Sequence, residues 1–67
     1  MNDSLVSIVI PNYNRANLIG ETLDSIIQQT YEDWECIIID DQSTDQSIEI
    51  IKNYTRKDPQ FLLIERP

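Results

Sequence analysis

The sequence has no histidine, one cysteine and one glycine. With Cys36 as the single thiol, the chain forms no internal disulfide, no zinc site of Cys and His ligands, and no Cys–His nucleophile pair. The scarcity of glycine leaves no Gly-rich phosphate loop, which excludes the dinucleotide-binding fingerprint and the Walker loop. No apolar run approaches the roughly 20 residues of a membrane span. Residues 1–4 also lack the basic start of a signal peptide.

Basic residues are few as well: 5 Lys and Arg stand against 12 Asp and Glu, giving a formal net charge of −7. This balance argues against a nucleic-acid partner, because binding to phosphate backbones depends on basic side chains. An apolar content of 40% argues against disorder. Yet 67 residues lie near the lower limit for a self-sufficient core. We therefore expect a globular chain that has little core of its own.

What the sequence does contain is an alternation of short apolar runs and helical stripes. Three β-branched or aromatic runs predict strands that are buried on both faces. Apolar residues at i, i+4, i+7 and i+8, from Ile19 to Ile27, predict a helix, and Ser43 with Gln46 forms a capping-box pattern that predicts the start of another. The predicted elements are strands at 5–10, 34–39 and 61–64, a helix at 16–29 and a helix that ends near Tyr54. Cys36 lies inside the second strand and is predicted to be a buried core residue.

The order β-α-β-α-β predicts an α/β fold with a three-stranded parallel sheet in the strand order 3-2-1. Right-handed crossovers place both helices on one face of that sheet and leave the other face bare. Strands of this buried type need cover on both faces, so we expect residues 1–67 to be the start of a larger domain. The bare face and a free edge at the first strand predict that the chain alone self-associates or stays disordered.

Ligands of open parallel sheets bind at the carboxyl ends of the strands. Two polar clusters follow the first two strands there, Pro11–Arg15 and Asp40–Asp45, and neighbouring parallel strands should bring them side by side. Because consecutive residues at a strand end point in different directions, one of Asp40 and Asp41 is expected to accept a hydrogen bond from a ligand while the other braces the loop. The alternative is a solvated acidic turn that caps the next helix.

The other polar residues of the first loop each have two interpretations. Tyr13 either packs at the sheet edge or stacks on a nucleobase, and Arg15 is either a solvated charge or a phosphate contact. Asn14 or Asn17 is predicted to be the N-cap of the first helix. A phosphorylated ligand would need further positive charge, from a metal ion or from residues beyond Pro67.

Three segments resemble the start of family 2 glycosyltransferases, in the family's order and spacing: Val6–Asn14, the helix ending Ser25–Tyr31, and Trp34–Asp45. The resemblance covers nearly the whole chain, and its small departure is Gln42, where the family often has Gly or Asn. It implies a GT-A (Rossmann-like) fold, in which residues 1–67 form the N-terminal nucleotide-binding part of an incomplete catalytic domain. It also implies a nucleotide-diphosphate-sugar donor, commonly a UDP-sugar, and inversion at the anomeric carbon.

Carried onto this sequence, the resemblance implies a nucleotide pocket built by the first two loops. Pro11 and Tyr13 would line the pocket and stack on the base, Asp41 would accept a hydrogen bond from it, and Asp40 would support Asp41. Arg15 completes the set of candidate nucleotide-binding residues. The family's Asp-x-Asp metal motif and its catalytic base lie further along its sequence. Residues 1–67 are therefore expected to hold no catalytic or metal-binding residue and to be inactive alone.

For the full-length enzyme, the resemblance implies Mg²⁺ or Mn²⁺ at the departing diphosphate, and a saccharide or lipid-linked acceptor whose hydroxyl attacks the sugar. It further implies polysaccharide biosynthesis in the cytoplasm, with peripheral association at the inner face of the membrane. Two alternatives stay open: a non-catalytic nucleotide-binding module and a receiver-like signalling domain. The receiver pattern fits less well, because its acidic pair follows the first strand and its phosphoacceptor Asp follows the third.

Overall fold

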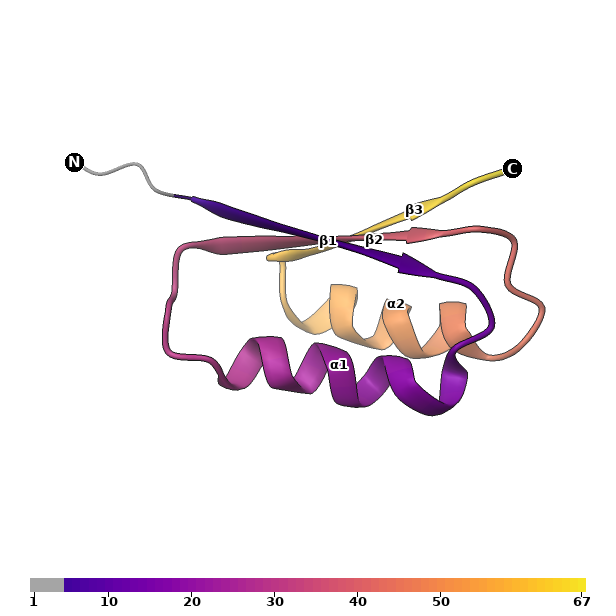
Figure 1. Cartoon of the computed structure of the whole chain (residues 1–67), viewed down its shortest axis with the longest axis horizontal. Helices are drawn as coiled ribbons and strands as arrows, with labels where there is room; N and C mark the ends of the chain where they lie inside the picture. Colours follow the sequence, from indigo (N-terminus) through magenta and orange to yellow (C-terminus); the bar gives the residue numbers. More distant parts are fainter. Residues whose placement is uncertain (1–4) are drawn as a thin grey trace.

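The structure is a computed structural model that describes residues 5–67. The elements follow the order β-α-β-α-β along the chain (Figure 1). They are β1 Val6–Asn12, α1 Ala16–Gln28, β2 Trp34–Asp40, α2 Ser47–Lys57 and β3 Phe61–Glu65. All five predicted elements are present, so the α/β class is confirmed.

The three strands form one parallel sheet in the order β1-β2-β3, which is the predicted order 3-2-1 read from the other edge. In the middle of the sheet, Ile38 of β2 pairs with Ile10 on one side and Leu63 on the other. Both helices lie on the same face of the sheet (Figure 1). This arrangement follows from two right-handed crossovers in the same direction, as predicted.

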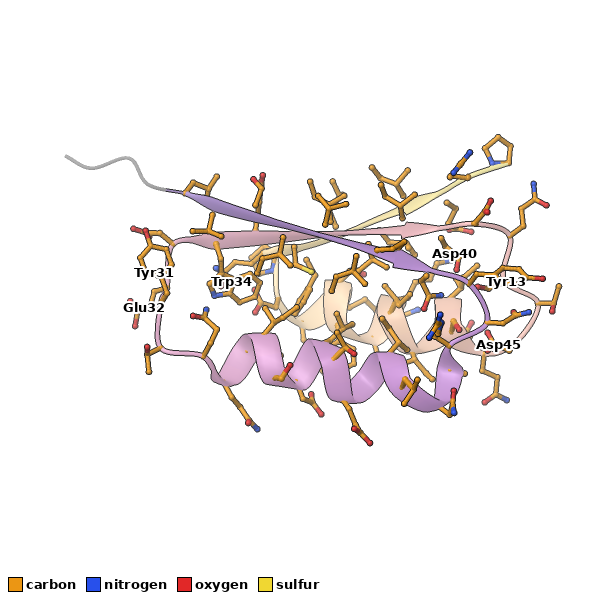
Figure 2. The ribbon with its side chains drawn as sticks, in the orientation of Figure 1. Tyr13, Tyr31, Glu32, Trp34, Asp40 and Asp45 are labelled. Atoms are coloured by element: carbon orange, nitrogen blue, oxygen red, sulfur yellow. The ribbon has the colours of Figure 1, made fainter. Side chains whose placement is uncertain are left out.

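The opposite face of the sheet carries apolar side chains with no element of residues 5–67 above them (Figure 2). At the edges of this face, Val9 of β1 is 56% exposed and Leu62 of β3 is 54% exposed. Ile37, their register partner on β2, is half-buried. The predicted bare face is therefore present in the structure.

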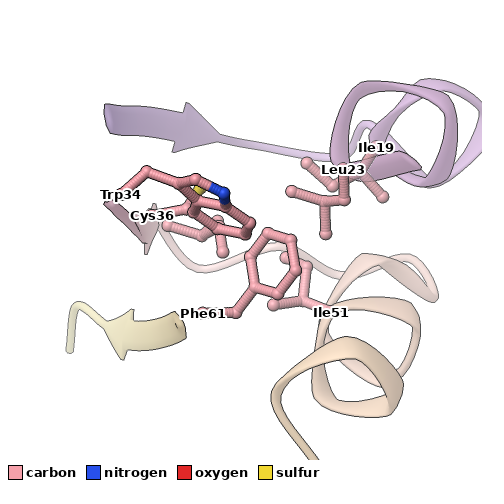
Figure 3. Packing of buried hydrophobic residues seen from close by; sticks show 7 residues of the cluster. Ile19, Leu23, Trp34, Cys36, Ile51 and Phe61 are labelled. Atoms are coloured by element: carbon pink, nitrogen blue, oxygen red, sulfur yellow. The ribbon is translucent and has the colours of Figure 1, made fainter. Parts of the chain in front are cut away.

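The core lies between the sheet and the two helices (Figure 3). Apolar side chains from every layer fill it, and β2 supplies the largest share because it is the central strand. The buried residues are Ile19, Leu23, Trp34, Cys36, Ile38, Ile51 and Phe61. Trp34 meets Phe61 edge to face with 5.3 Å between ring centroids, a favourable aromatic geometry. Burial raises the pKa of Cys36 to about 11, so this thiol stays protonated and is a core residue, as predicted.

The first strand extends further than predicted. It continues through Pro11 to Asn12 instead of stopping at Ile10, and it begins at Val6, one residue later than predicted. Proline is tolerated because β1 is an edge strand of the described sheet, where not every residue has to donate a hydrogen bond. The extension matters for the site, because it places Asn12 opposite Asp40 in the register of the sheet.

The predicted helix caps are wrong. The N-cap position of α1 is Arg15, Asn17 lies within the helix, and neither α1 nor α2 has a side-chain hydrogen bond from its own N-cap residue. Ser43 lies outside α2, which begins at Ser47 and ends at Lys57, three residues after Tyr54. The capping-box pattern failed because Ser43 bonds to the end of β2 instead, as described below.

Candidate functional site

The loops after β1 and β2 lie side by side at the carboxyl edge of the sheet, as their positions in the sequence predicted. The backbone N–H of Asp41 donates to the carbonyl oxygen of Asn12 at 3.0 Å, and the backbone N–H of Arg66 donates to the carbonyl oxygen of Asp40 at 2.8 Å. Backbone pairing thus continues one residue past the ends of β2 and β3. Asp41 and Arg66 are therefore held at the backbone beside the neighbouring strand ends.

Asp40 is a buried brace between these loops. Its side chain has no exposed surface, and its carboxylate accepts hydrogen bonds from Asn12 Nδ2 at 2.8 Å and from the backbone N–H and hydroxyl of Ser43 at 2.9 Å and 2.5 Å. Burial by itself would raise the pKa of Asp40, but the hydrogen bonds from Ser43 and Asn12 outweigh it and hold the pKa below its ordinary value. Asp40 is therefore ionised at neutral pH and is directed into the protein, away from any ligand.

A second set of hydrogen bonds joins the two loops through Asn14. Its side-chain carbonyl oxygen accepts hydrogen bonds from the backbone N–H groups of Thr44 at 2.8 Å and Asp45 at 3.2 Å. Its backbone N–H donates a hydrogen bond to the Ser43 hydroxyl at 2.8 Å. Asn14 has a φ of 51°, a left-handed conformation that Asn adopts more readily than most residues. Asn14 is thus a bridge between loops and not the helix cap that was predicted.

Asp45 occupies the N-terminal ends of both helices. Its carboxylate accepts from the backbone N–H of Ala16 in α1 at 3.0 Å and from the backbone N–H of Ser47 in α2 at 2.9 Å. The hydrogen bond from the Ser47 hydroxyl is the main cause of a lowered pKa for Asp45, and the backbone N–H groups add to it against partial desolvation. The positive poles of both helix dipoles are therefore occupied by a carboxylate of this chain.

Gln42 also has a left-handed backbone, with a φ of 66°. This conformation is strained for a residue with a side chain and is usually taken by Gly or Asn. It explains the preference for Gly or Asn at this point, from which Gln42 departs. The turn is held instead by its neighbours, since Asp41 and Ser43 are each bonded to the ends of the strands.

An open pocket of about 360 Å³ lies at this edge of the sheet, within the usual size range of small-molecule sites. It is lined by Pro11, Asn12, Tyr13, Arg15, Ile39, Asp41 and Arg66. Tyr13 extends outward from the loop after β1 (Figure 2) and is 57% exposed. The structure thus brings together four of the five candidate nucleotide-binding residues; Asp40 alone lies beneath the pocket and not in its lining.

Three residues of this pocket were not among the predicted site residues: the apolar Ile39 and the polar Asn12 and Arg66. Asn12 was placed in the first polar cluster, in a turn, and was given no role; its amide holds Asp40, and its Oδ1 atom is buried without a hydrogen-bond partner among the described residues. Arg66 was overlooked because further positive charge was sought beyond Pro67. The register of the parallel sheet was the signal that would have found both, since it aligns the ends of the three strands.

The described residues offer no site for a metal ion. Within residues 5–67, no group of three or more Cys, Asp or Glu side chains is arranged to hold one. Two of the acids near the pocket, Asp40 and Asp45, are already bonded within the protein. The divalent metal that the resemblance implies therefore does not fit a ligand set in this part of the chain.

Neither helix in residues 5–67 has the length and apolar character needed to cross a bilayer.

Residues 7–67 match the family described as glycosyl transferase family 2, and the chain belongs to this family. The match includes both loops of the pocket, β2, β3 and all of β1 except Val6. Apart from Val6, it covers the residues on which the resemblance was based.

Several glycosyltransferases are similar to the chain. The poly(ribitol-phosphate) beta-glucosyltransferase of Bacillus spizizenii is 49% identical over 63 residues, which are 91% of this chain and 10% of that protein. Glycosyltransferase GlyA of Streptococcus pneumoniae is 41% identical over 64 residues, which are 96% of this chain and 9% of that protein. The chain thus spans about a tenth of the length of these two relatives.

A solved structure with a similar fold is the mannosyltransferase PcManGT of Pyrobaculum calidifontis, in complex with GDP-Man and Mn²⁺. It is 32% identical, with a TM-score of 0.82, over 91% of this chain and 19% of that chain. This similarity confirms the GT-A fold that the resemblance implied.

The pKa values of Asp40 and Asp45 predict how stability depends on pH. Both are lower in the folded protein than in the unfolded chain, so their ionisation stabilises the fold above the unfolded-state pKa of about 4. That stabilisation is lost as the pH falls through the folded-state values. We expect thermal unfolding, followed by circular dichroism, to show a steep loss of stability below about pH 4.

Substitution of Asp40 separates its share of this effect. Asp40→Asn lowers stability at neutral pH by about 1–3 kcal/mol, because it puts an N–H₂ group among the donors of Asn12 and Ser43. It also weakens the loss of stability in acid. Glu21→Gln, at an exposed position of α1, is the matched control and keeps the wild-type pH profile. An Asp40→Asn variant with the same acid-dependent loss as the wild type would contradict the assignment.

Proposed function

We propose that the chain forms the nucleotide-binding part of a glycosyltransferase that uses a nucleotide-diphosphate-sugar donor. The observation that carries this proposal is the pocket where Tyr13 and Asp41 meet at the carboxyl edge of a parallel sheet. Tyr13 offers an exposed ring on which a base can stack, worth about 1–3 kcal/mol. Asp41 is an exposed carboxylate that can accept a hydrogen bond from a base N–H.

The buried network beneath the pocket positions these two groups. Asp40 fixes the loop after β2, and the backbone bond from Asp41 to Asn12 fixes the position of Asp41 relative to β1. Pro11 and Ile39 supply an apolar floor between them. We infer that Asp40 contributes to nucleotide binding by holding Asp41 in place and not by direct contact.

The base is inferred to be uracil, so the donor is a UDP-sugar. This assignment rests on the resemblance, and the GDP-Man bound to the mannosyltransferase of Pyrobaculum calidifontis makes guanine the competing choice. Both bases present an imino N–H from which Asp41 can accept a hydrogen bond. Arg15, also in the pocket lining, is proposed to contact a phosphate of the donor.

The proposed reaction of the full-length protein is attack by an acceptor hydroxyl on the anomeric carbon, with inversion. A carboxylate base and the ligands of Mg²⁺ or Mn²⁺ would come from residues outside this chain. The Mn²⁺ in the mannosyltransferase structure agrees with the use of a divalent metal. The acceptor is proposed to be a saccharide or a lipid-linked saccharide, in line with relatives such as a teichuronic acid biosynthesis glycosyltransferase of Bacillus subtilis and a chondroitin synthase of Pasteurella multocida. We place this activity in polysaccharide biosynthesis at the cytoplasmic face of the membrane.

Nucleotide titration tests the pocket. UDP binding, measured by calorimetry on the full-length protein, is expected to weaken about tenfold or more in Asp41→Ala and in Tyr13→Ala, because each removes a direct base contact. Asp33→Ala removes an exposed carboxylate that does not line this pocket, and it serves as the control for lost charge. Unchanged UDP and GDP affinity in both pocket variants would overturn the proposed residue roles.

The enzyme is distinguished from a non-catalytic module by activity. We expect the full-length protein to transfer sugar from a UDP-sugar in the presence of Mg²⁺ or Mn²⁺, while residues 1–67 alone show no turnover. The sequence of the encoding gene provides an independent check, since an Asp-x-Asp motif after a further strand is expected only of the transferase. Nucleotide binding without transfer, and without that motif, would identify a binding module.

We also propose that residues 1–67, produced alone, self-associate through the bare face of the sheet. Val9 and Leu62 are more than half exposed on this face, and apolar surfaces and free strand edges drive association. Light scattering in dilute buffer is expected to show oligomers, and Val9→Lys is expected to reduce their size. Glu21→Lys, on α1 away from this face, adds the same side chain and should leave the association intact. A compact monomer of the unsubstituted chain would refute the proposal.

A further inference from the structure

Three residues of different chemistry form one row across the carboxyl edge of the sheet. Asn12, Asp40 and Glu65 are register partners and are the last residues of their strands. The residues that directly follow them are Tyr13, Asp41 and Arg66, and all three line the same pocket. An aromatic ring, a carboxylate and a guanidinium therefore follow one another from β1 to β3.

Arg66 is fixed at the backbone and has a free side chain. Its N–H is bonded to the carbonyl oxygen of Asp40, which sets its position beside Asp41. Its side chain is exposed, and no hydrogen bond or ion pair holds its guanidinium among residues 5–67. In a chain with a net charge of −7 and 5 basic residues, Arg66 is one of two arginines that line this pocket, together with Arg15. Its five N–H donors are available to a ligand.

We propose that Arg66 is a specificity-determining residue that donates a hydrogen bond to the base carbonyl next to the imino N–H accepted by Asp41. This inference rests on the proposed function, and it defines which edge of the donor's base is recognised. Uracil and guanine both present an imino N–H directly beside a carbonyl oxygen. An acceptor and a long donor side chain on adjacent strands, whose spacing is about 4.8 Å, can converge on such a pair of neighbouring groups.

The position of Arg66 favours the base over the phosphates. Asp41 stands between Tyr13 and Arg66 in the row, so a base that stacks on Tyr13 and bonds to Asp41 directs its far edge toward Arg66. That edge lies opposite the ribose, from which the phosphates extend. Arg15 follows the loop on the β1 side of the pocket and is not adjacent to Asp41 in this row. The two arginines of the pocket thus have different tasks.

A ligand series separates the two ends of the nucleotide. Uridine, UMP and UDP are titrated into the full-length protein without added metal, and binding is followed by NMR. Arg66→Ala is expected to weaken all three by the same factor, about tenfold, because the lost contact is to the base that they share. Lys57→Ala, which removes an exposed positive charge from the end of α2, is the matched control and should leave all three affinities unchanged.

The other possible results of this titration distinguish the role of Arg66 from the proposed function. A loss for UDP that is absent for uridine would assign Arg66 to the phosphates and overturn the proposal. Unchanged binding in Arg66→Ala, with weakened binding in Asp41→Ala, would overturn the role of Arg66 and leave the proposed function intact. Failure of the unsubstituted protein to bind any of these ligands or GDP would refute the proposed function itself. Because Arg66 is exposed and only its backbone is bonded, its substitution should not unfold the protein.

Discussion

The carboxylate of Asp40 is the contact on which the geometry of this edge depends. It is fully buried, and it holds together the end of β1, through Asn12, and the loop after β2, through Ser43. A buried carboxylate is stable only when hydrogen bonds replace the water it has lost. The hydrogen bonds that stabilise the charge of Asp40 therefore also fix the two loops. The exposed side chains of Tyr13 and Asp41 are held in position as a result.

Much of the fold follows from the sequence because its signals are local and repeated. The β-branched run of β2 and the apolar stripe of α1 each predicted an element that the structure contains. The parallel order and the bare face then followed from the handedness of the crossovers. The helix caps could not be predicted in this way. Ser43 and Asn14 are residue types that often cap helices, but here Ser43 bonds to Asp40 at the end of β2, and Asn14 bonds to the other loop, about 30 residues away in sequence.

The candidate site was predictable to the extent that it depends on strand ends. Two loops were expected to meet, and they do, with Tyr13 and Asp41 in one pocket. The residues themselves left the choice between Asp40 and Asp41 open, because a pair of adjacent acids does not reveal which one is turned inward; the family resemblance assigned the ligand contact to Asp41, and the structure shows Asp40 buried. Arg66 required the register of β3, since a basic residue near a chain end carries no local signal of a site.

The hydrogen bonds between the loops after β1 and β2 have a thermodynamic consequence for any ligand at this edge. Hydrogen bonds of Asn14, Ser43 and Asp45 already restrict both loops in the chain without a nucleotide. Their conformational entropy is lost during folding, so little remains to be lost when a ligand arrives. The strained turn at Gln42 is part of this arrangement, because the folded sheet holds it in place. The carboxyl edge of the sheet is therefore preorganised. The affinity of a ligand there is set by its contacts with the protein and not by the ordering of the loops.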